Sequence, residues 1–575
     1  MSEEMKFKTR APLLAAWLTK PMMAHRATYI KVALAATMVN LLGIAASMFT
    51  MTVYDRVIPN NAISSLIALT IGLGIVLVFD FILRTLRGYF VDIAGADIDY
   101  HIGEAVFGRI LALRLDLKRG STGALAGLMR ELESLREFFA SATLSAIVDV
   151  PFILLSLLLI WLIGGIVVII PLVMVPLVIL VAWLTHPAMD RLSAQAMGDG
   201  LLKQSVLVET IGGIETVKTS GAGPMLSQRW TSAVRDHAAV SLRQRLVSTI
   251  SVTVATSANT IAYAGVVVVG VAPLATNDLT TGGLVACSIL AGRAIAPLGQ
   301  IAQLMSRMTA TRAAYRQIDA MMTLPPEGPE GPALALAKVT GRIEFRNVSF
   351  RYPGAAEKAL DGVSFLITPG EHLAIIGRVG SGKSTIAKLI LGLYPPEDGL
   401  ILLDGTDVRQ LDPTALRANI GAAMQESVLF TGSVRENIIL GREGVGDDEL
   451  IRVAEISGTH QFIGQMANGY DLKLADRGEG MSGGQRQSIA VARSLIGQPQ
   501  IMVFDEPTSA MDGQTETALL QRLNMEMTQR TMILITHRPP LLGLVKRIIL
   551  LDKGKIIADG PRDRVLAQIN APKAA

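Results

Sequence analysis

A loop that can hold phosphate groups lies in the second half of the chain. The residues read Gly377-Arg378-Val379-Gly380-Ser381-Gly382-Lys383-Ser384 and match the pattern G-x-x-x-x-G-K-[ST]. Glycines let backbone amides approach phosphates closely, and the helix predicted to follow offers its positive end. We expect Lys383 to reach the β- and γ-phosphates of ATP and the Ser384 hydroxyl to bind Mg²⁺. Thr385, the next residue, is assigned to the same nucleotide site.

An apolar run that ends in two carboxylates supplies the rest of the expected chemistry. Residues 501–504 predict a buried strand, and Asp505 and Glu506 follow it. Asp505 is suited to hold Mg²⁺, directly or through water, and Glu506 to act as general base on the attacking water. A core strand ending in acidic loop residues would have the same local pattern. The strand, the acid pair and the phosphate loop occur together in the right order, which favours ATP hydrolysis.

The pentapeptide Met481-Ser482-Gly483-Gly484-Gln485 lies between these motifs and resembles the signature of ATP-binding cassette (ABC) proteins. The resemblance covers about residues 340–570. It implies that residues 482–485 close over the γ-phosphate of an ATP held by a second copy, so the chain must dimerise. The intact motifs make a homodimer with two competent sites the simplest expectation. Met481 replaces the usual leucine, an apolar exchange of similar volume that we expect to be harmless.

The same resemblance assigns roles to further residues. It implies that Tyr352 stacks on adenine, although an ordinary strand residue would also fit this position. It implies that Gln425 touches Mg²⁺ and the attacking water, and that His537 contacts the γ-phosphate. Residues 509–512 resemble the loop through which the two ATPase domains meet. The expected catalytic residues are therefore Glu506, His537 and Gln425, and the expected Mg²⁺ ligands are Ser384, Gln425 and Asp505.

The first half of the chain is apolar enough to cross a membrane repeatedly. Half of the 575 residues are apolar, and they are concentrated before about residue 310. Six segments reach spanning length. Lys and Arg number six in residues 1–31, eight in 84–141 and seven in 186–247, whereas the opposite loops contain only Arg56. The positive-inside rule therefore places both termini in the cytoplasm. The predicted spans are 32–53, 63–83, 142–163, 164–185, 248–272 and 282–304.

Two domains follow from this pattern, and together they resemble an ABC exporter half-transporter. The resemblance implies an α-helical six-span membrane domain of ABC exporter type and an α/β P-loop ATPase domain of ABC type. The long cytoplasmic stretches have helical apolar spacing, for example from Leu125 to Phe139, and predict helices that continue below the membrane. Residues 323–340 hold four prolines and two glycines, which is typical of a linker. The predicted boundaries are 1–31 for a cytoplasmic segment, 32–322 for the membrane domain, 323–340 for the linker and 341–575 for the ATPase domain.

The stretch Met51-Thr-Val-Tyr-Asp-Arg-Val-Ile-Pro-Asn-Asn-Ala62 resembles exporters of bacterial type I secretion systems, and other segments within residues 15–320 agree. The resemblance implies ATP-driven export of an unfolded protein with an uncleaved C-terminal signal across the inner membrane. It also implies a periplasmic membrane-fusion protein and an outer-membrane channel as partners. The short segment before the first span predicts no N-terminal peptidase-like domain. A flippase or exporter of a lipid, peptide or small molecule stays open as the alternative.

Composition and the polar residues of the spans narrow the remaining possibilities. The net charge of +4 is spread along the chain and predicts no nucleic-acid surface. Cys287 is the only cysteine, which excludes an intramolecular disulfide. We expect Asp80, Arg84 and Asp149 to be solvated or paired near helix ends. Arg293 either lines a translocation cavity or pairs with another helix. The residues expected to form interhelical hydrogen bonds are Asn40 and Asn259.

Overall fold

The computed structural model describes residues 15–117, 122–138, 143–329, 331–334, 336 and 339–570, and the chain divides into two compact units. One unit comprises Met1–Leu111 and Arg119–Leu324, and the other comprises Ala112–Lys118 and Pro325–Ala575. Residues 1–14 of the predicted N-terminal segment, and Phe139 of the predicted helical spacing, lie outside the described residues. The boundaries of the linker, 323–340, stay a prediction.

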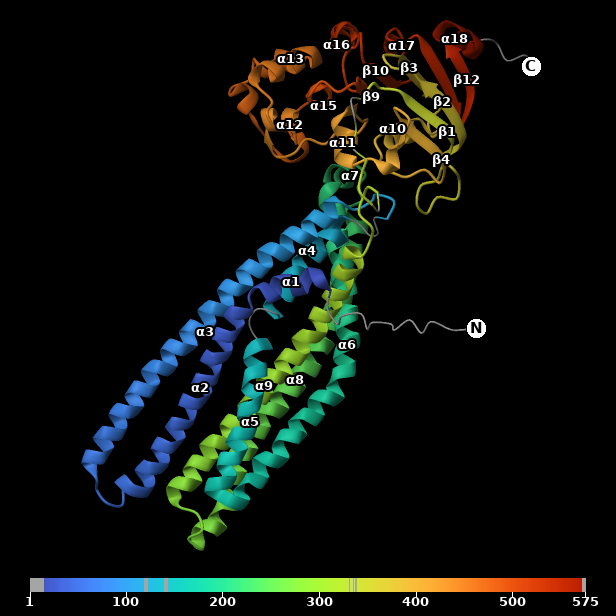
Figure 1. The fold of residues 1–575 in the computed structure, drawn as a ribbon. Helices are drawn as coiled ribbons and strands as arrows, with labels where there is room; N and C mark the ends of the chain where they lie inside the picture. The colour runs from blue at the N-terminus through green and yellow to red at the C-terminus, as the bar shows by residue number, and fades with distance from the viewer. Residues whose placement is uncertain are drawn as a thin grey trace, which may run out of the picture. The chain divides into compact units, whose positions relative to one another are not determined.

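The first unit consists of helices (Figure 1). The longest, α8, has 53 residues, which at 1.5 Å per residue is roughly 80 Å and far exceeds the thickness of a bilayer core. The long helices therefore continue well beyond their apolar segments. The elements are α1 (Ala16–Ala24), α2 (Arg26–Thr52), η1 (Val53–Val57), α3 (Ile63–Leu111), α4 (Thr122–Glu137), α5 (Thr143–Gly164), η3 (Gly165–Val168), α6 (Ile169–Gly212), α7 (Ile214–Thr219), α8 (Gly223–Ala275) and α9 (Thr281–Met322).

Five stretches of the described chain are long and apolar enough to cross a membrane. One of them, Val148–Gly212, contains most of α5 and all of α6, joined by the short turn η3. Gly165 in this turn has a φ of +55°, a conformation that glycine adopts without a steric penalty. The five stretches thus contain six apolar helices, in the order that the sequence predicts.

The segment around Asp55 joins the first long helix to the last. Asp55 lies in η1, and its carboxylate accepts hydrogen bonds from the Thr280 hydroxyl at 2.6 Å and the Gly282 backbone N–H at 2.8 Å. A Cβ on Gly282 would lie only 2.4 Å from the carbonyl oxygen of Met51. Asp55 therefore fastens the start of α9 to the end of α2. Within residues 51–62, which resemble secretion exporters, Asp55 therefore stabilises the contact between two helices.

Small residues let the helices of this unit pack closely, and polar side chains join some of them. Asn40 of α2 donates to Asp149 of α5 at 2.6 Å, which confirms the expected interhelical hydrogen bond. The expectation for Asn259 is wrong. Its Oδ1 atom is buried without a partner among the described residues, because it faces Gly292 of α9, which has no side chain that could donate a hydrogen bond. Cys287 is buried and packs beside Ile160.

The second unit contains a six-stranded sheet in the order β12-β11-β3-β10-β9-β6 and a four-stranded antiparallel sheet in the order β2-β1-β4-β5. Figure 1 shows α12 and α13 grouped at one end of this unit and β1, β2 and β4 at the other. The described elements are β1 (Ile343–Phe350), β2 (Leu360–Ile367), β3 (His372–Gly377), α10 (Lys383–Ile390), β4 (Asp398–Leu403), β5 (Thr406–Asp407), η4 (Val408–Gln410), α11 (Pro413–Ala418), β6 (Ile420–Ala423), β7 (Gly432–Ser433), α12 (Val434–Ile439), α13 (Asp447–Ser457), α14 (Thr459–Ile463), η5 (Gly469–Asp471), β8 (Lys473–Leu474), η6 (Asp476–Gly478), α15 (Gly483–Leu495), β9 (Ile501–Asp505), α16 (Gly513–Glu526), β10 (Thr531–Ile535), α17 (Pro539–Leu542), β11 (Arg547–Asp552), β12 (Lys555–Pro561) and α18 (Arg562–Asn570).

The parallel strands of the larger sheet bring the predicted motifs to one edge. Ile535 of β10 is paired with both Ile375 of β3 and Asp505 of β9, and Ala423 of β6 is paired with Phe504 of β9. The carboxyl ends of β3, β6, β9 and β10 therefore lie together. Ligands bind at this edge in open parallel sheets.

Candidate nucleotide site

The phosphate loop follows β3 directly and depends on glycines at two close approaches. Gly377 has a φ of +154°, and a Cβ there would lie 2.0 Å from the carbonyl oxygen of Leu551. Gly382 has a φ of +101°, and a Cβ there would lie 2.4 Å from the carbonyl oxygen of Ala359. Only glycine fits either position without displacing backbone. The loop tip, residues 378–380, is exposed, whereas Ser381 and Thr385 are buried.

Lys383, the first residue of α10, folds back over the loop. Its Nζ donates to the carbonyl oxygens of Gly377 at 2.9 Å and Arg378 at 2.8 Å. Burial lowers the pKa of Lys383, while the negative charges of Glu506 and Asp505 act in the opposite direction. The ammonium group is thus held at the loop, where a phosphate could replace the two carbonyls as its partner.

Tyr352 lies beside the start of α10. Its hydroxyl is 3.1 Å from the hydroxyl of Thr385, and its ring packs edge-on against Phe350 and Tyr394. Lys388 of α10 lies 5.4 Å from the centre of the ring. These contacts fix the aromatic ring next to the phosphate loop, where the sequence predicts the adenine-stacking residue.

The residues expected to hold Mg²⁺ offer suitable donors. Asp505 is 2% exposed, and its Oδ1 atom is buried without a hydrogen-bond partner among the described residues. Burial raises the pKa of Asp505, whereas a hydrogen bond from the Ser384 side chain acts to lower it. A buried carboxylate oxygen without a partner, next to a hydroxyl, fits a small dication that prefers oxygen ligands. Gln425 is exposed just beyond β6, at the same sheet edge.

Glu506 and His537 form a contact pair at this edge. His537 Nδ1 lies 2.7 Å from Glu506 Oε1, and the Glu506 backbone N–H donates to the carbonyl of Ile535 at 2.9 Å. Glu506 has a φ of +50°, which costs free energy for a residue with a side chain and is often found at functional sites. The backbone therefore holds this carboxylate in a defined direction beside the phosphate loop.

The pentapeptide 481–485 begins α15. Ser482 is the N-cap residue: its hydroxyl accepts from the Gln485 backbone N–H at 3.2 Å, and the Gln485 side chain accepts from the Ser482 N–H at 2.9 Å. This capping box leaves Ser482 exposed at the positive end of a 13-residue helix. Gly484 lies against the backbone of Ala510 and Met511, so the pentapeptide and the loop 509–512 pack together.

One residue of this region was missed by the sequence analysis. Gln487 of α15 donates to the Ser509 hydroxyl at 2.6 Å and accepts from the Ala510 backbone N–H at 2.9 Å. It also approaches the Glu506 carbonyl at 3.4 Å. Gln487 therefore links the pentapeptide helix, the loop 509–512 and the segment that carries Glu506. The sequence alone does not show which face of α15 lies against these loops, so the contacts of Gln487 could not be predicted.

Two family models match the chain, one described as ABC transporter over residues 360–509 and the other as ABC transporter transmembrane region over residues 29–298. The toxin RTX-I translocation ATP-binding protein of Actinobacillus pleuropneumoniae is 30% identical over 96% of this chain and 78% of that protein. The chain belongs to the ABC transporter family. It is a multi-pass inner-membrane protein that couples ATP hydrolysis to transport, and the predicted two-domain fold class is confirmed.

Other similar proteins are exporters too. The leukotoxin export ATP-binding protein LtxB of Aggregatibacter actinomycetemcomitans is 30% identical over 96% of this transporter and 78% of that protein. A solved structure of a bacterial Atm1-family ABC exporter with ATP bound has a TM-score of 0.82 and 25% sequence identity, covering 97% of this chain and 99% of that one. The similarity therefore extends through both the membrane region and the ATPase region.

A partly buried ionic network stabilises the ATPase domain of the transporter, and the sequence alone did not predict it. Arg538, directly after His537, donates to the Thr508 carbonyl at 2.6 Å and to Glu516 Oε1 at 2.8 Å. The Thr508 hydroxyl donates to the same Glu516 oxygen at 2.6 Å. This network fixes the segment after Glu506 relative to the segment of His537. Breaking one partner of such a buried pair leaves a charge without compensation.

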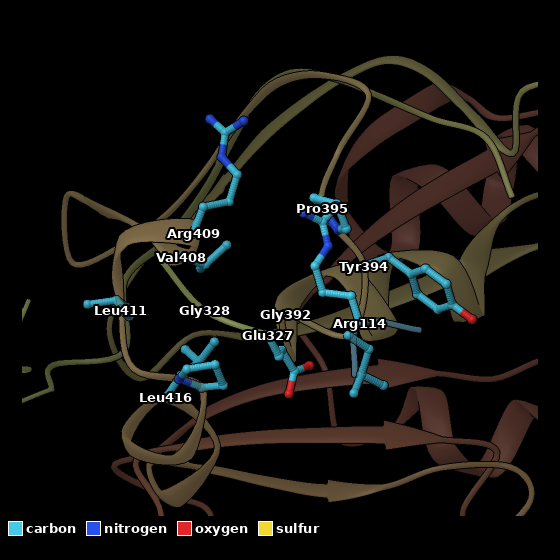
Figure 2. A pocket seen from close by; sticks show the side chains of 12 residues that line it. Arg114, Glu327, Gly328, Gly392, Tyr394, Pro395, Val408, Arg409, Leu411 and Leu416 are labelled. Carbon is cyan, nitrogen blue, oxygen red and sulfur yellow. The ribbon is translucent and has the colours of Figure 1, made fainter. Parts of the chain in front are cut away.

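Figure 2 shows a cavity of the ATPase unit near the C-terminal end of α10. Arg114, from the segment after α3, and Glu327 lie in its wall. Glu327 forms a two-point ion pair with Arg417 of α11, with one bond of 2.9 Å between Arg417 Nη1 and Glu327 Oε2. Arg417 also donates to the carbonyl of Leu391 at 3.0 Å, just past α10.

The same glutamate reaches the segment that leaves α3. The backbone N–H of Glu327 donates to the carbonyl of Ala112 at 2.7 Å, and Leu113 forms a β-bridge with Pro326. Within this unit, a continuous set of bonds therefore runs from the end of the phosphate-loop helix through Arg417 and Glu327 to the residues around Ala112.

Proposed function

We propose that two copies of this chain export an unfolded polypeptide across the bacterial inner membrane, powered by ATP. The observation that carries the proposal is the alignment with named toxin and leukotoxin exporters over 96% of the chain, since it includes the membrane region that would contact cargo. The polypeptide carries an uncleaved C-terminal signal. A periplasmic membrane-fusion protein and an outer-membrane channel complete the path.

Each ATP is held between the two copies. Lys383 exchanges its loop carbonyls for the β- and γ-phosphates, the amides of residues 377–385 surround the phosphates, and Tyr352 stacks on adenine. Ser482, Gly483, Gly484 and Gln485 of the other copy present the positive start of α15 to the γ-phosphate. The exposure of Ser482 supports this role, because a phosphate of the other copy's ATP could reach the start of α15 and replace the capping-box hydrogen bonds.

Hydrolysis uses the pair at the sheet edge. Glu506 accepts a proton from the attacking water, and His537, 2.7 Å away in this structure, orients that carboxylate and contacts the γ-phosphate. Ser384, Gln425 and Asp505 would hold Mg²⁺, which would neutralise charge on the phosphates. Gln425 also positions the water. ATP binding closes the two ATPase domains, the helical extensions transmit the movement to the spans, and hydrolysis resets them.

Secreted protein provides the test of the proposed function. Cells that lack this chain should lose at least one large protein from the culture medium and retain it inside, and the intact gene should restore its release. A gene encoding Glu506→Gln should not restore it, because binding without hydrolysis cannot complete a cycle. An unchanged set of secreted proteins, together with an altered membrane lipid composition, would instead assign the transporter to lipid flipping.

A further inference from the structure

A cavity of about 180 Å³ lies within the helical unit, between α2, α3, α5 and α9. Three arginines line it: Arg84 and Arg87 of α3 and Arg293 of α9. Asp149 of α5 is the only carboxylate among the residues that line this cavity in the described chain. Positive charge in a membrane region is costly unless it has a partner or a function. The excess of guanidinium groups therefore requires an explanation.

Hydrogen bonds within the protein account for only part of this charge. Arg84 donates to Asp80 at 2.6 Å, one helical turn away, so this arginine has its own carboxylate. Asp149 accepts a hydrogen bond from the neutral amide of Asn40 at 2.6 Å, and it forms no ion pair with an arginine of the described chain. Asp80 and Asp149 are thus paired as expected, but neither forms an ion pair with the other two arginines.

Arg87 and Arg293 form no hydrogen bond and no close ion pair with any residue that the structure describes, although the negative charge of Asp80 attracts Arg293 at longer range. Both are half-buried, and they come from different helices. Arg293 reaches across from α9 to the backbone of α2: a Cβ on Gly43 would lie only 1.6 Å from its Nη1 atom. Glycine at this position gives the guanidinium group its place in the wall of the cavity. Of the two alternatives from the sequence, the structure supports the cavity-lining one.

The geometry points to a binding site for carboxylate groups of the transported polypeptide, formed by Arg87 and Arg293 in this cavity. The guanidinium group matches a carboxylate because its parallel N–H groups donate to both oxygens. An unfolded chain presents such groups as aspartate and glutamate side chains and as its terminal carboxylate. A passing carboxylate would neutralise the two arginines in turn. This inference rests on the proposed export of protein, and it adds that the transport pathway binds carboxylate groups of the polypeptide.

Acidic peptides test the site directly. The full-length protein is placed in nanodiscs of phosphatidylcholine, and fluorescence anisotropy measures binding of glycine–serine peptides that carry several aspartates or the same number of asparagines. The unsubstituted protein should bind the aspartate peptide about tenfold more tightly or better, in line with charge-assisted hydrogen bonds. The double variant Arg87→Gln and Arg293→Gln should lose this preference, with unchanged affinity for the asparagine peptide and unchanged basal ATP hydrolysis.

Two matched variants separate charge from placement. Arg293→Lys keeps the positive charge but loses the two parallel N–H donors. Gly43→Ala keeps Arg293 but displaces its guanidinium group. Each should weaken binding of the aspartate peptide by a smaller factor than the double variant does. If the double variant still preferred the aspartate peptide, the inference would be wrong. Equal affinity of the unsubstituted protein for both peptides would also overturn it, but would not contradict the proposed export of protein. If neither peptide bound to the unsubstituted protein, the proposed export of protein itself would be contradicted. Loss of aspartate-peptide binding when phosphatidylglycerol is added would assign the arginines to lipid phosphate and overturn the inference.

Discussion

The Glu506→Gln variant will hydrolyse ATP at least about a hundredfold more slowly than the unsubstituted transporter, because an amide cannot accept the proton of the attacking water. The substitution preserves the size of the side chain. The contact between Oε1 and His537, 2.7 Å in this structure, can persist, and so can the backbone bond to Ile535. ATP should therefore still bind, and the protein should retain labelled ATP after rapid desalting.

A matched substitution controls for loss of a negative charge. Glu443 is an exposed glutamate of the same unit, so Glu443→Gln should hydrolyse ATP at the unsubstituted rate. The measurement is phosphate release by purified protein with ATP and Mg²⁺. Near-normal release by Glu506→Gln would show that another group is the base, and the assignment of the sheet-edge pair would then be wrong.

Mixed dimers should regain ATP hydrolysis that neither parent variant has. Lys383→Ala removes the phosphate contact and Ser482→Arg blocks the start of α15, so each variant alone should lose at least about a hundredfold in rate. If ATP lies between two copies, a dimer of one chain of each kind keeps one intact site. Its working site joins the unsubstituted phosphate loop of one copy to the unsubstituted signature of the other. Two affinity tags allow this mixed dimer to be purified and assayed.

The reciprocal pairing gives the opposite expectation. A dimer of an unsubstituted chain and a chain that carries both substitutions has a damaged half in each shared site, so it should be inactive. Sites formed within one chain would reverse both results: the first mixture would be inactive and the second would keep half of its sites. Because the outcome depends on pairing and not on the substitutions themselves, loss of folding cannot imitate it.

The local motifs of the ATPase unit could be predicted because each lies in one short stretch of sequence. The phosphate loop needs glycines where its backbone approaches Leu551 and Ala359, and the carboxylates come directly after an apolar strand. The parallel register then brings Gly377, Asp505 and the segment of His537 to one edge. Their roles in the reaction stay predictions until the variants above are measured.

Contacts between distant segments could not be predicted. Asp55 meets Thr280 across 225 residues, and Arg417 meets Glu327 across 90. The sequence around each of these residues does not indicate which distant residue it contacts. The membrane helices add a second difficulty, since their nearly continuous apolar surface does not reveal how each helix is rotated about its axis. For this reason the expectation for Asn259 was wrong, and the two alternatives for Arg293 needed the structure.

Transport by the purified protein tests the central claim most directly. Inside-out vesicles that contain the transporter, and its periplasmic partner where one is required, are incubated with the protein identified in the secretion experiment, kept unfolded. Protection of that protein from added protease is measured over time. The account predicts protection that requires ATP hydrolysis, is absent with Glu506→Gln, and falls when the cargo is allowed to fold first. Vesicles that hydrolyse ATP and move a labelled lipid, yet never protect the polypeptide, would contradict it.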